Sequence, residues 1–186
     1  MKRMLDVAAG ALLLLVLWPI LLLVALAIRL ESKGPAIYKQ IRVGKDGREF
    51  TCYKFRTMFT GTTDLPTHQV AASAVTPLGD YLRRFKIDEL PQLFNVISGS
   101  MSLVGPRPSL PSQVELVEAR RRLGVLGVRP GITGLAQVRG VDMSDAERLA
   151  ELDARYVHDQ SFAGDLKLIW ATLRGQGVGV DQVVRT

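Results

Sequence analysis

The chain has 186 residues, enough for one domain that buries an apolar core without disulfides. Its 24 lysines and arginines exceed its 18 aspartates and glutamates, and this excess of positive charge favours partners that carry phosphate. A single cysteine, Cys52, excludes an intramolecular disulfide and a zinc site built from several thiolates, so we expect a small, half-buried strand residue.

Residues 7–28 are all apolar residues, glycine or proline, and as a helix they are long enough to cross the hydrocarbon core of a bilayer. Pro19 lies inside this run and predicts a break or bend, because it lacks an N–H group and its ring clashes with an earlier carbonyl. The run is closed directly by Arg29 and no A-x-A site follows, so we do not expect cleavage as a signal peptide.

A bend at Pro19 leaves two arrangements open. A kinked helix can span the bilayer, or a helix-break-helix can enter one leaflet and return to the side from which it came. Positive charge favours the cytoplasmic face, and it is present at both ends, as Lys2 and Arg3 before the run and Arg29 after it. The charges therefore favour the returning path.

Beyond residue 32 the pattern predicts a compact, mainly α domain with one small β-hairpin, formed by residues 36–43 and 49–55 around a turn at 44–47. Residues 60–76 have no period and are expected to form a loop. Thr76 offers an N-cap with Pro77 at the first helical position, for a helix that should end near Ile87. Further helices are expected over residues 90–97, 112–123 and 162–174, and after a capping-box pattern at Ser144 and Glu147.

The last predicted helix carries four apolar residues on one side: Leu166, Ile169, Trp170 and Leu173. Such a face usually packs into a core. Beside a membrane anchor, an amphipathic helix can instead lie in the bilayer interface, where tryptophan and basic residues are favoured. Both interpretations are open from the sequence.

Asp88 and Glu89 are neighbouring acids in a segment that also holds Arg83, Arg84 and Lys86. Charges at this density often form a solvated surface of salt bridges. Pro91 stops one helix and starts another, which predicts that the two acids lie at a helix N-terminus, where Asp88 would be an N-cap. The alternative is a carboxylate that acts as a nucleophile or metal ligand beside a bound phosphate.

Two other segments favour phosphate binding. Arg107 stands between two prolines, which restrict its backbone and pre-organise a guanidinium suited to bidentate contact with phosphate. Lys54 and Arg56 are two residues apart in a predicted strand and therefore share one face. No glycine fingerprint of a dinucleotide-binding fold and no Walker loop is present.

With these segments, the chain resembles the bacterial monotopic phosphoglycosyl transferases, in their minimal form without an N-terminal multi-span extension. The matching motifs cover most of the chain: residues 2–6 (KRMLD), 34–44 (GPAIYKQIRVG), 54–58 (KFRTM), 88–92 (DELPQ), 99–108 (GSMSLVGPRP) and 129–138 (RPGITGLAQV). Members often have serine before the helix-breaking proline, where this chain has Trp18, so the bend would depend on Pro19 alone.

The resemblance implies transfer of sugar 1-phosphate from a nucleotide diphosphate sugar, usually a UDP-sugar, to polyprenol phosphate, with release of UMP as the first membrane step of glycoconjugate synthesis. It implies Mg²⁺ and a covalent phosphosugar intermediate on Asp88, with Glu89 as metal ligand or proton-handling partner. Arg83 and Arg107 would neutralise the diphosphate, and Lys54 and Arg56 would position the nucleotide sugar. Nucleic acid is not expected as a partner.

For the architecture, the resemblance implies a re-entrant membrane hairpin over residues 1–32 and a catalytic domain over residues 33–186, with interfacial amphipathic helices. The domain would lie on the cytoplasmic face of the bacterial inner membrane. The loop 60–76 and the tail after Gly175 are candidates for shaping the sugar pocket. The competing hypothesis is an inert scaffold on the membrane surface, whose basic face binds anionic lipid and which has no need of Asp88.

Overall fold

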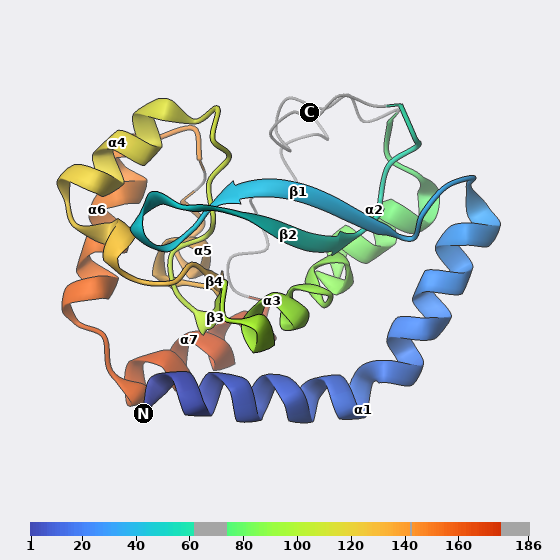
Figure 1. Cartoon of the computed structure of the whole chain (residues 1–186), viewed down its shortest axis with the longest axis horizontal. Helices are drawn as coiled ribbons and strands as arrows, with labels where there is room; N and C mark the ends of the chain where they lie inside the picture. Colours follow the sequence, from blue (N-terminus) through green and yellow to red (C-terminus); the bar gives the residue numbers. More distant parts are fainter. Residues whose placement is uncertain (62–73, 142, 176–186) are drawn as a thin grey trace.

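The computed structural model describes residues 1–61, 74–141 and 143–175, so most of the loop 60–76 and the tail after Gly175 lie outside the described residues. The fold is mainly helical, with a small antiparallel hairpin and one long apolar helix at the N-terminus (Figure 1). Its elements are α1 Lys2–Glu31, β1 Ile37–Val43, β2 Glu49–Phe55, α2 Pro77–Arg84, α3 Gln92–Ser98, β3 Ser102–Val104, α4 Val114–Arg122, β4 Gly131–Thr133, α5 Leu135–Val138, α6 Ala146–His158 and α7 Phe162–Leu173.

Helix α1 is 30 residues long and contains Pro19. Figure 1 shows it as two arms joined by a bend, while the helix itself continues through the bend. The expected break is therefore a bend without an interruption. Most side chains along its middle are exposed and apolar, including Leu15 and Leu23 at 70% and 66% exposure, so the helix could cross a membrane by length and composition.

The N-terminal end of α1 is fastened to the compact domain. Lys2 Nζ donates to Asp165 Oδ2 on α7 at 2.5 Å, and Arg3 donates to the carbonyl of Ile97 at the end of α3 at 2.9 Å. Asp6 is buried and accepts hydrogen bonds from the hydroxyl of Ser102 and from the amide that follows it in β3.

The C-terminal end of α1 is fastened to the same domain. The Arg56 guanidinium donates to the Ser32 and Lys33 carbonyls, both at 2.7 Å, and so holds the turn that directly follows the helix. Glu31 accepts from the amide of Leu78 in the first turn of α2. Both ends of the apolar helix thus contact one domain.

The hairpin is confirmed: β1 and β2 pair antiparallel from Ile37 opposite Phe55 to Val43 opposite Glu49. Its turn includes Asp46 and Gly47, both with positive φ, which fits the aspartate and glycine found there. The first predicted helix cap is also confirmed, since Thr76 Oγ1 accepts from the Gly79 amide with Pro77 at the first position of α2. Cys52 is buried in β2 rather than half-buried.

Two short strands were not predicted. β3 and β4 pair in parallel, with Ser102 opposite Gly131, and their contact leaves no room for side chains at the glycines. A Cβ atom on Gly131 would lie 2.1 Å from the Gly105 amide nitrogen, and one on Gly134 would lie 2.2 Å from the Gly105 carbonyl oxygen. These glycines allow the segment before Arg107 to pack directly on the segment after Pro130.

Replacing Gly131 by alanine is expected to lower the free energy of unfolding by about 3 kcal/mol, the upper end of the usual cost of overpacking. Urea unfolding in detergent micelles, followed by tryptophan fluorescence, measures the change. Gly127→Ala is the matched control, because a Cβ atom there meets nothing within 4 Å. Equal stability of the two variants would contradict the close approach of β3 and β4.

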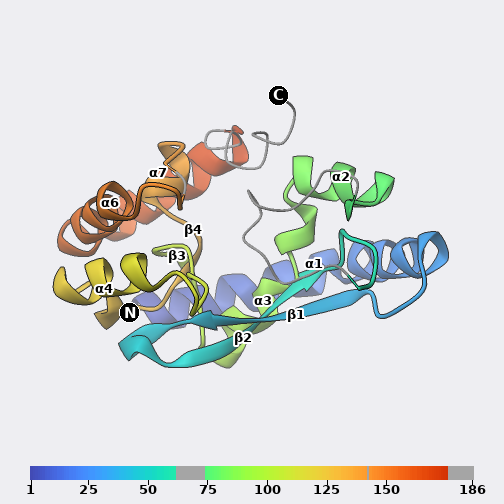
Figure 2. The same ribbon diagram turned by 90° about the horizontal axis from the view of Figure 1, so that it is seen from above.

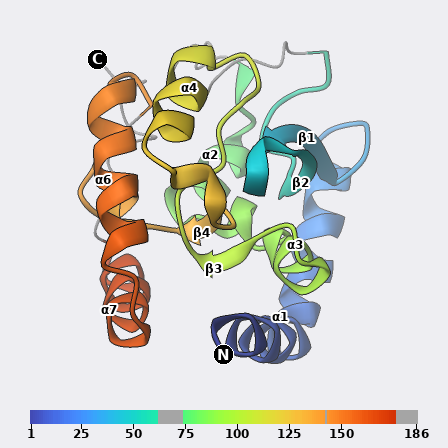
Figure 3. The same cartoon turned by 60° about the vertical axis from the view of Figure 1, so that its left-hand side comes forward.

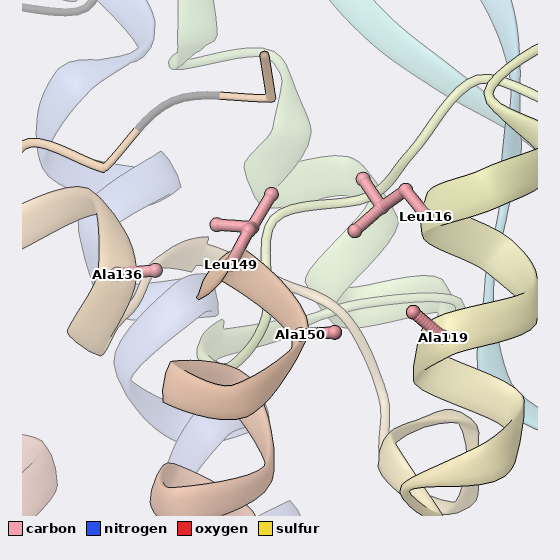
Figure 4. Packing of buried hydrophobic residues seen from close by; sticks show 5 residues of the cluster. All are labelled: Leu116, Ala119, Ala136, Leu149 and Ala150. Carbon is pink, nitrogen blue, oxygen red and sulfur yellow. The ribbon is translucent and has the colours of Figure 1, made fainter. Parts of the chain in front are cut away.

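The C-terminal helices form a second packed layer, seen beside the hairpin in Figure 2. Leu116 and Ala119 of α4 pack with Leu149 and Ala150 of α6 and with Ala136 of α5, and the two leucines point toward one another (Figure 4). The predicted capping box is displaced by one residue, because Asp145, not Ser144, accepts from the Arg148 amide at the start of α6.

Helix α7 exposes its apolar side. Leu166 and Trp170 are each more than half exposed, Leu173 is 74% exposed, and the Arg174 guanidinium lies 4.8 Å from the Trp170 ring centroid. Figure 3 shows α7 and the N-terminal arm of α1 at the same edge of the molecule. Of the two interpretations of this face, packing into the core of this chain is wrong.

Candidate active site

Asp88 and Glu89 lie in a 3₁₀ turn, Ile87–Glu89, between α2 and α3. Lys86 directly precedes the turn as its N-cap residue and has a left-handed backbone with φ of 55°. Helix α3 starts only at Gln92 and has Pro91 at its N-cap, so the prediction that Asp88 caps this helix is wrong. The proline does separate two helical segments as expected, but the acids occupy the turn between them.

Both acids are buried, with Asp88 8% and Glu89 6% exposed, which also excludes a solvated surface of salt bridges. Glu89 Oε1 accepts from Arg107 Nη2 at 2.6 Å and from Lys54 Nζ at 3.0 Å. Burial alone would raise the pKa of Glu89, but the charges and hydrogen bonds of Arg107 and Lys54 outweigh it and hold the pKa well below its usual range. Glu89 is therefore ionised at neutral pH.

The two cations reach Glu89 from different parts of the chain. Lys54 is on β2 and Arg107 follows β3, so packing of the hairpin and of the β3–β4 pair against the 3₁₀ turn is what brings the three charges together. Arg42 on β1 adds a further positive charge close by. Burial, and then repulsion from Arg107, lowers the pKa of Arg42 to about 10, and it is still positive at neutral pH.

This arrangement gathers positive charge around two buried acids. Lys54 and Arg107 contact the ionised Glu89, and Arg42 lies close to them with a third positive charge. A partly buried site with excess positive charge attracts an anion more strongly than an exposed one does, because the surroundings screen the charges less. The site is therefore suited to a phosphate group that lies next to a carboxylate.

Arg83 and Arg56 have other partners. Arg83 Nε donates to the Thr57 hydroxyl at 2.9 Å, which joins α2 to the segment that follows β2. Arg56 is buried and holds the end of α1, and its Nη2 also donates to the Ser32 hydroxyl at 3.0 Å. Lys54 and Arg56 were predicted to act together on phosphate. Instead, Lys54 contacts Glu89, whereas Arg56 contacts the end of α1.

Four residues near Arg107 had no predicted role. Arg42 and Arg120 each donate to a backbone carbonyl of the Pro106–Pro108 segment, and Gln40 and Asp153 hold these two arginines. Gln40 and Arg42 belong to a family motif, but nothing in their spacing indicated what they contact. Arg120 was one of three consecutive arginines, and only its burial distinguishes it from the other two.

The acids fit a divalent cation such as Mg²⁺. Within the described ranges, no three histidines, cysteines or acids are grouped as a closed metal site. Mg²⁺ does not require one, because it is commonly held by one or two carboxylates together with substrate phosphates and water. The hydrogen bonds from Lys54 and Arg107 both fall on Glu89 Oε1, and Asp88 is the preceding residue in the same turn, so these two acids suit a cation shared with a bound diphosphate.

Comparison with known proteins gives the family. The model of the bacterial sugar transferase family matches residues 1–176. The chain therefore belongs to the bacterial sugar transferases, as its motifs indicate.

Three relatives illustrate the family. An undecaprenyl-phosphate glucose phosphotransferase of Komagataeibacter xylinus is 43% identical over 93% of the chain and 35% of its own length. A UDP-glucose:undecaprenyl-phosphate glucose-1-phosphate transferase of Caulobacter vibrioides is 43% identical over 92% of the chain and 68% of its own length. An N-acetylgalactosaminephosphotransferase of Aeromonas hydrophila, whose name also includes undecaprenyl phosphate, is 37% identical over 93% of the chain and 43% of its own length. The chain thus spans less than half the length of two of them.

Proposed function

We propose that the protein is a phosphoglycosyl transferase, which moves sugar 1-phosphate from a UDP-sugar to polyprenol phosphate and releases UMP. The observation that carries this proposal is the buried pair Asp88 and Glu89, with Arg107 and Lys54 held on Glu89. The names of the relatives support the same reaction, and because they include glucose and N-acetylgalactosamine transferases, they leave the sugar open.

In the proposed first step, a carboxylate oxygen of Asp88 attacks the phosphorus that bears the sugar. A bond forms between Asp88 and phosphorus, the bond from that phosphorus to the bridging oxygen breaks, and UMP leaves with the bridging oxygen. In the second step, an oxygen of polyprenol phosphate attacks the same phosphorus. The Asp88 carboxylate is released, and the product is a polyprenol diphosphate sugar.

An anionic nucleophile must approach an anionic diphosphate, so charge neutralisation is the main requirement. We assign Arg107 and Lys54 to the phosphates, because both already lie at the acids. For Arg83, only the family resemblance supports a contact with the same substrate, because its Nε donates to the Thr57 hydroxyl. Arg56 is not, because its hydrogen bonds hold the end of α1.

Glu89 is proposed to orient Arg107 and Lys54 and, with Asp88, to hold Mg²⁺. When bound, Mg²⁺ would neutralise charge on the diphosphate. An acid that is ionised at neutral pH is a poor proton donor, and a carboxylate whose pKa lies well below its usual range is also a weak base, so an electrostatic role fits Glu89 better than proton transfer.

For the membrane, we propose that residues 1–32 form a re-entrant hairpin and that residues 33–186 form a catalytic domain on the cytoplasmic face of the bacterial inner membrane. A straight helix of 30 residues is about 45 Å long and would separate its ends by a whole bilayer. Here Lys2 and Ser32 are both bonded to one domain. The bend between the two arms and the exposed apolar side of α7 support a domain that rests on the interface.

The topology has a direct test. Cysteines in a short tag ahead of Met1 and at Lys33, which is exposed, are expected to react with an impermeant maleimide from the cytoplasmic side only. Burial raises the pKa of the native Cys52, so its background labelling should be low. Labelling of the two positions from opposite sides would establish a full span.

The activity is tested by incubating the purified full chain with polyprenol phosphate, Mg²⁺ and a panel of UDP-sugars, with UMP release as the signal. We expect one or a few sugars to release UMP, with a matching radiolabelled lipid product. An inert scaffold would instead bind anionic vesicles in a salt-dependent manner and release no UMP with any sugar. That outcome would refute the transferase.

A further inference from the structure

The backbone around Arg107 is held at two consecutive carbonyl groups. The Arg107 carbonyl accepts from Arg120 Nη1 at 2.8 Å, and the Pro108 carbonyl accepts from Arg42 Nη1 at 2.9 Å. The Arg107 side chain meanwhile extends to Glu89. One arginine at the site is thus held by two others that do not themselves hydrogen-bond to Glu89 in the part of the chain that is described.

Arg120 is placed by a buried ion pair between α4 and α6. It is 2% exposed, and its Nε and Nη2 donate to Asp153 Oδ2 at 2.9 and 2.6 Å, while Asp153 is 1% exposed. The planar guanidinium therefore uses one edge for the carboxylate and keeps Nη1 for the Arg107 carbonyl. A buried ion pair contributes little net stability, because desolvation offsets the attraction, so joining two helices is a weak reason for it.

Arg42 is placed in a similar manner from the hairpin. Its Nε and Nη2 donate to Gln40 Oε1 at 2.9 and 2.5 Å, and its Nη1 remains for the Pro108 carbonyl. Arg42 is buried and lies close enough to Arg107 for their like charges to repel. Placing Arg42 near a like charge lowers the stability of the fold, so stability does not explain its position. Its hydrogen bond instead keeps the Pro108 carbonyl in one orientation.

We propose that Arg120 and Arg42 are positioning residues that fix the backbone of Arg107 and so aim its guanidinium at the substrate phosphate. Asp153 and Gln40 orient these two arginines. The inference rests on the proposed function, in which Arg107 binds phosphate. Prolines restrict rotation at their own φ angles, whereas the two tethered carbonyls fix the direction of the two peptide units that follow Arg107. A guanidinium held in place before binding loses less entropy when phosphate arrives.

The competing explanation is that Arg120 and Asp153 only connect α4 to α6. The chain offers a matched control, because Arg122 and Glu147 connect the same two helices through an exposed ion pair. Arg122→Ala removes a contact between α4 and α6 without touching Arg107. Arg120→Lys keeps a positive charge for Asp153, but a single ammonium group cannot reproduce both edges of the guanidinium.

A double-mutant cycle decides between the two explanations. We expect Arg120→Lys to lower kcat/KM for UMP release about 10²-fold, the size expected for a misplaced catalytic group, and Arg122→Ala to leave it near wild type. In an Arg107→Ala background, Arg120→Lys should cause almost no additional loss, because its effect passes through Arg107. If Arg120→Lys lowers kcat/KM by the same factor in the wild-type and the Arg107→Ala backgrounds, with an unchanged Tm, the proposal is overturned.

Gln40→Leu is a second variant that should lower kcat/KM in the same manner as Arg120→Lys, and it leaves the ion pair between α4 and α6 intact.

A binding measurement separates this inference from the activity itself. Inorganic pyrophosphate with Mg²⁺, titrated calorimetrically, should bind about tenfold more weakly to Arg120→Lys than to wild type, but equally to the two variants that carry Arg107→Ala. If wild type releases no UMP, the proposed function fails, and the pyrophosphate titration still tests the positioning. Absence of pyrophosphate binding to wild type would overturn the positioning as well.

Discussion

Asp88→Asn is expected to abolish sugar-phosphate transfer, with a loss of at least about 10³-fold in kcat. An amide of the same shape has neither the charge nor the nucleophilic oxygen of the carboxylate, so no phosphosugar can be attached to it. With UDP-sugar and no acceptor, wild type should gain the mass of one sugar phosphate and the variant should not. Intact-protein mass spectrometry and UMP release measure the two effects.

Asp46→Asn is the matched control for this substitution. Asp46 lies in the hairpin turn with a φ of 58°, a conformation that asparagine tolerates well, and it is far along the hairpin from Lys54. Its activity should stay near that of wild type. Because Asp88 is buried, the Tm of both variants must also be compared. Transfer that survives in a folded Asp88→Asn protein would show that Asp88 is not the nucleophile.

Arg107→Ala should lower kcat/KM by about 10²–10³-fold, the usual cost of removing one group that stabilises charge in the transition state. The substitution removes both a phosphate ligand and the partner at 2.6 Å from Glu89 Oε1. Arg107→Lys should recover only a small part of the activity, because an ammonium group cannot make the same forked contact.

UMP release at several UDP-sugar concentrations measures this loss and separates its effects on KM and kcat. Arg139→Ala, on an exposed residue after α5, provides a control for loss of one positive charge from the chain. If Arg107→Ala and Arg139→Ala lose activity equally, the positive charge of the chain as a whole attracts the anionic substrate, and Arg107 has no specific role.

Local signals in the sequence were sufficient for several elements. The hairpin follows from two strand-like runs around a turn with aspartate and glycine, and the start of α2 follows from Thr76 and Pro77. Such features depend on residues within a few positions of one another. The boundary of α6 moved by one residue, because Ser144 and Asp145 are both good caps and only the folded helix selects between them.

Other parts could not be predicted because their partners are distant in the chain. β3 and β4 have three residues each, too few to show a period, and they are recognised only when Gly105 packs against Gly131. The role of Arg56 depends on where α1 ends in space. The exposed apolar side of α7 depends on which surfaces the other helices cover, since the same pattern suits a core or an interface.

By itself, the sequence determined the family, the apolar helix with its proline, and Asp88 with Glu89 as the candidate acids, because each is written in a contiguous motif. Only the tertiary structure decided that Glu89 accepts hydrogen bonds from Lys54 and Arg107, and that the buried Arg120 and Arg42 hold the backbone at Arg107 and Pro108. The strength of a charge pair depends on distance and burial, and packing between elements far apart in the chain sets both.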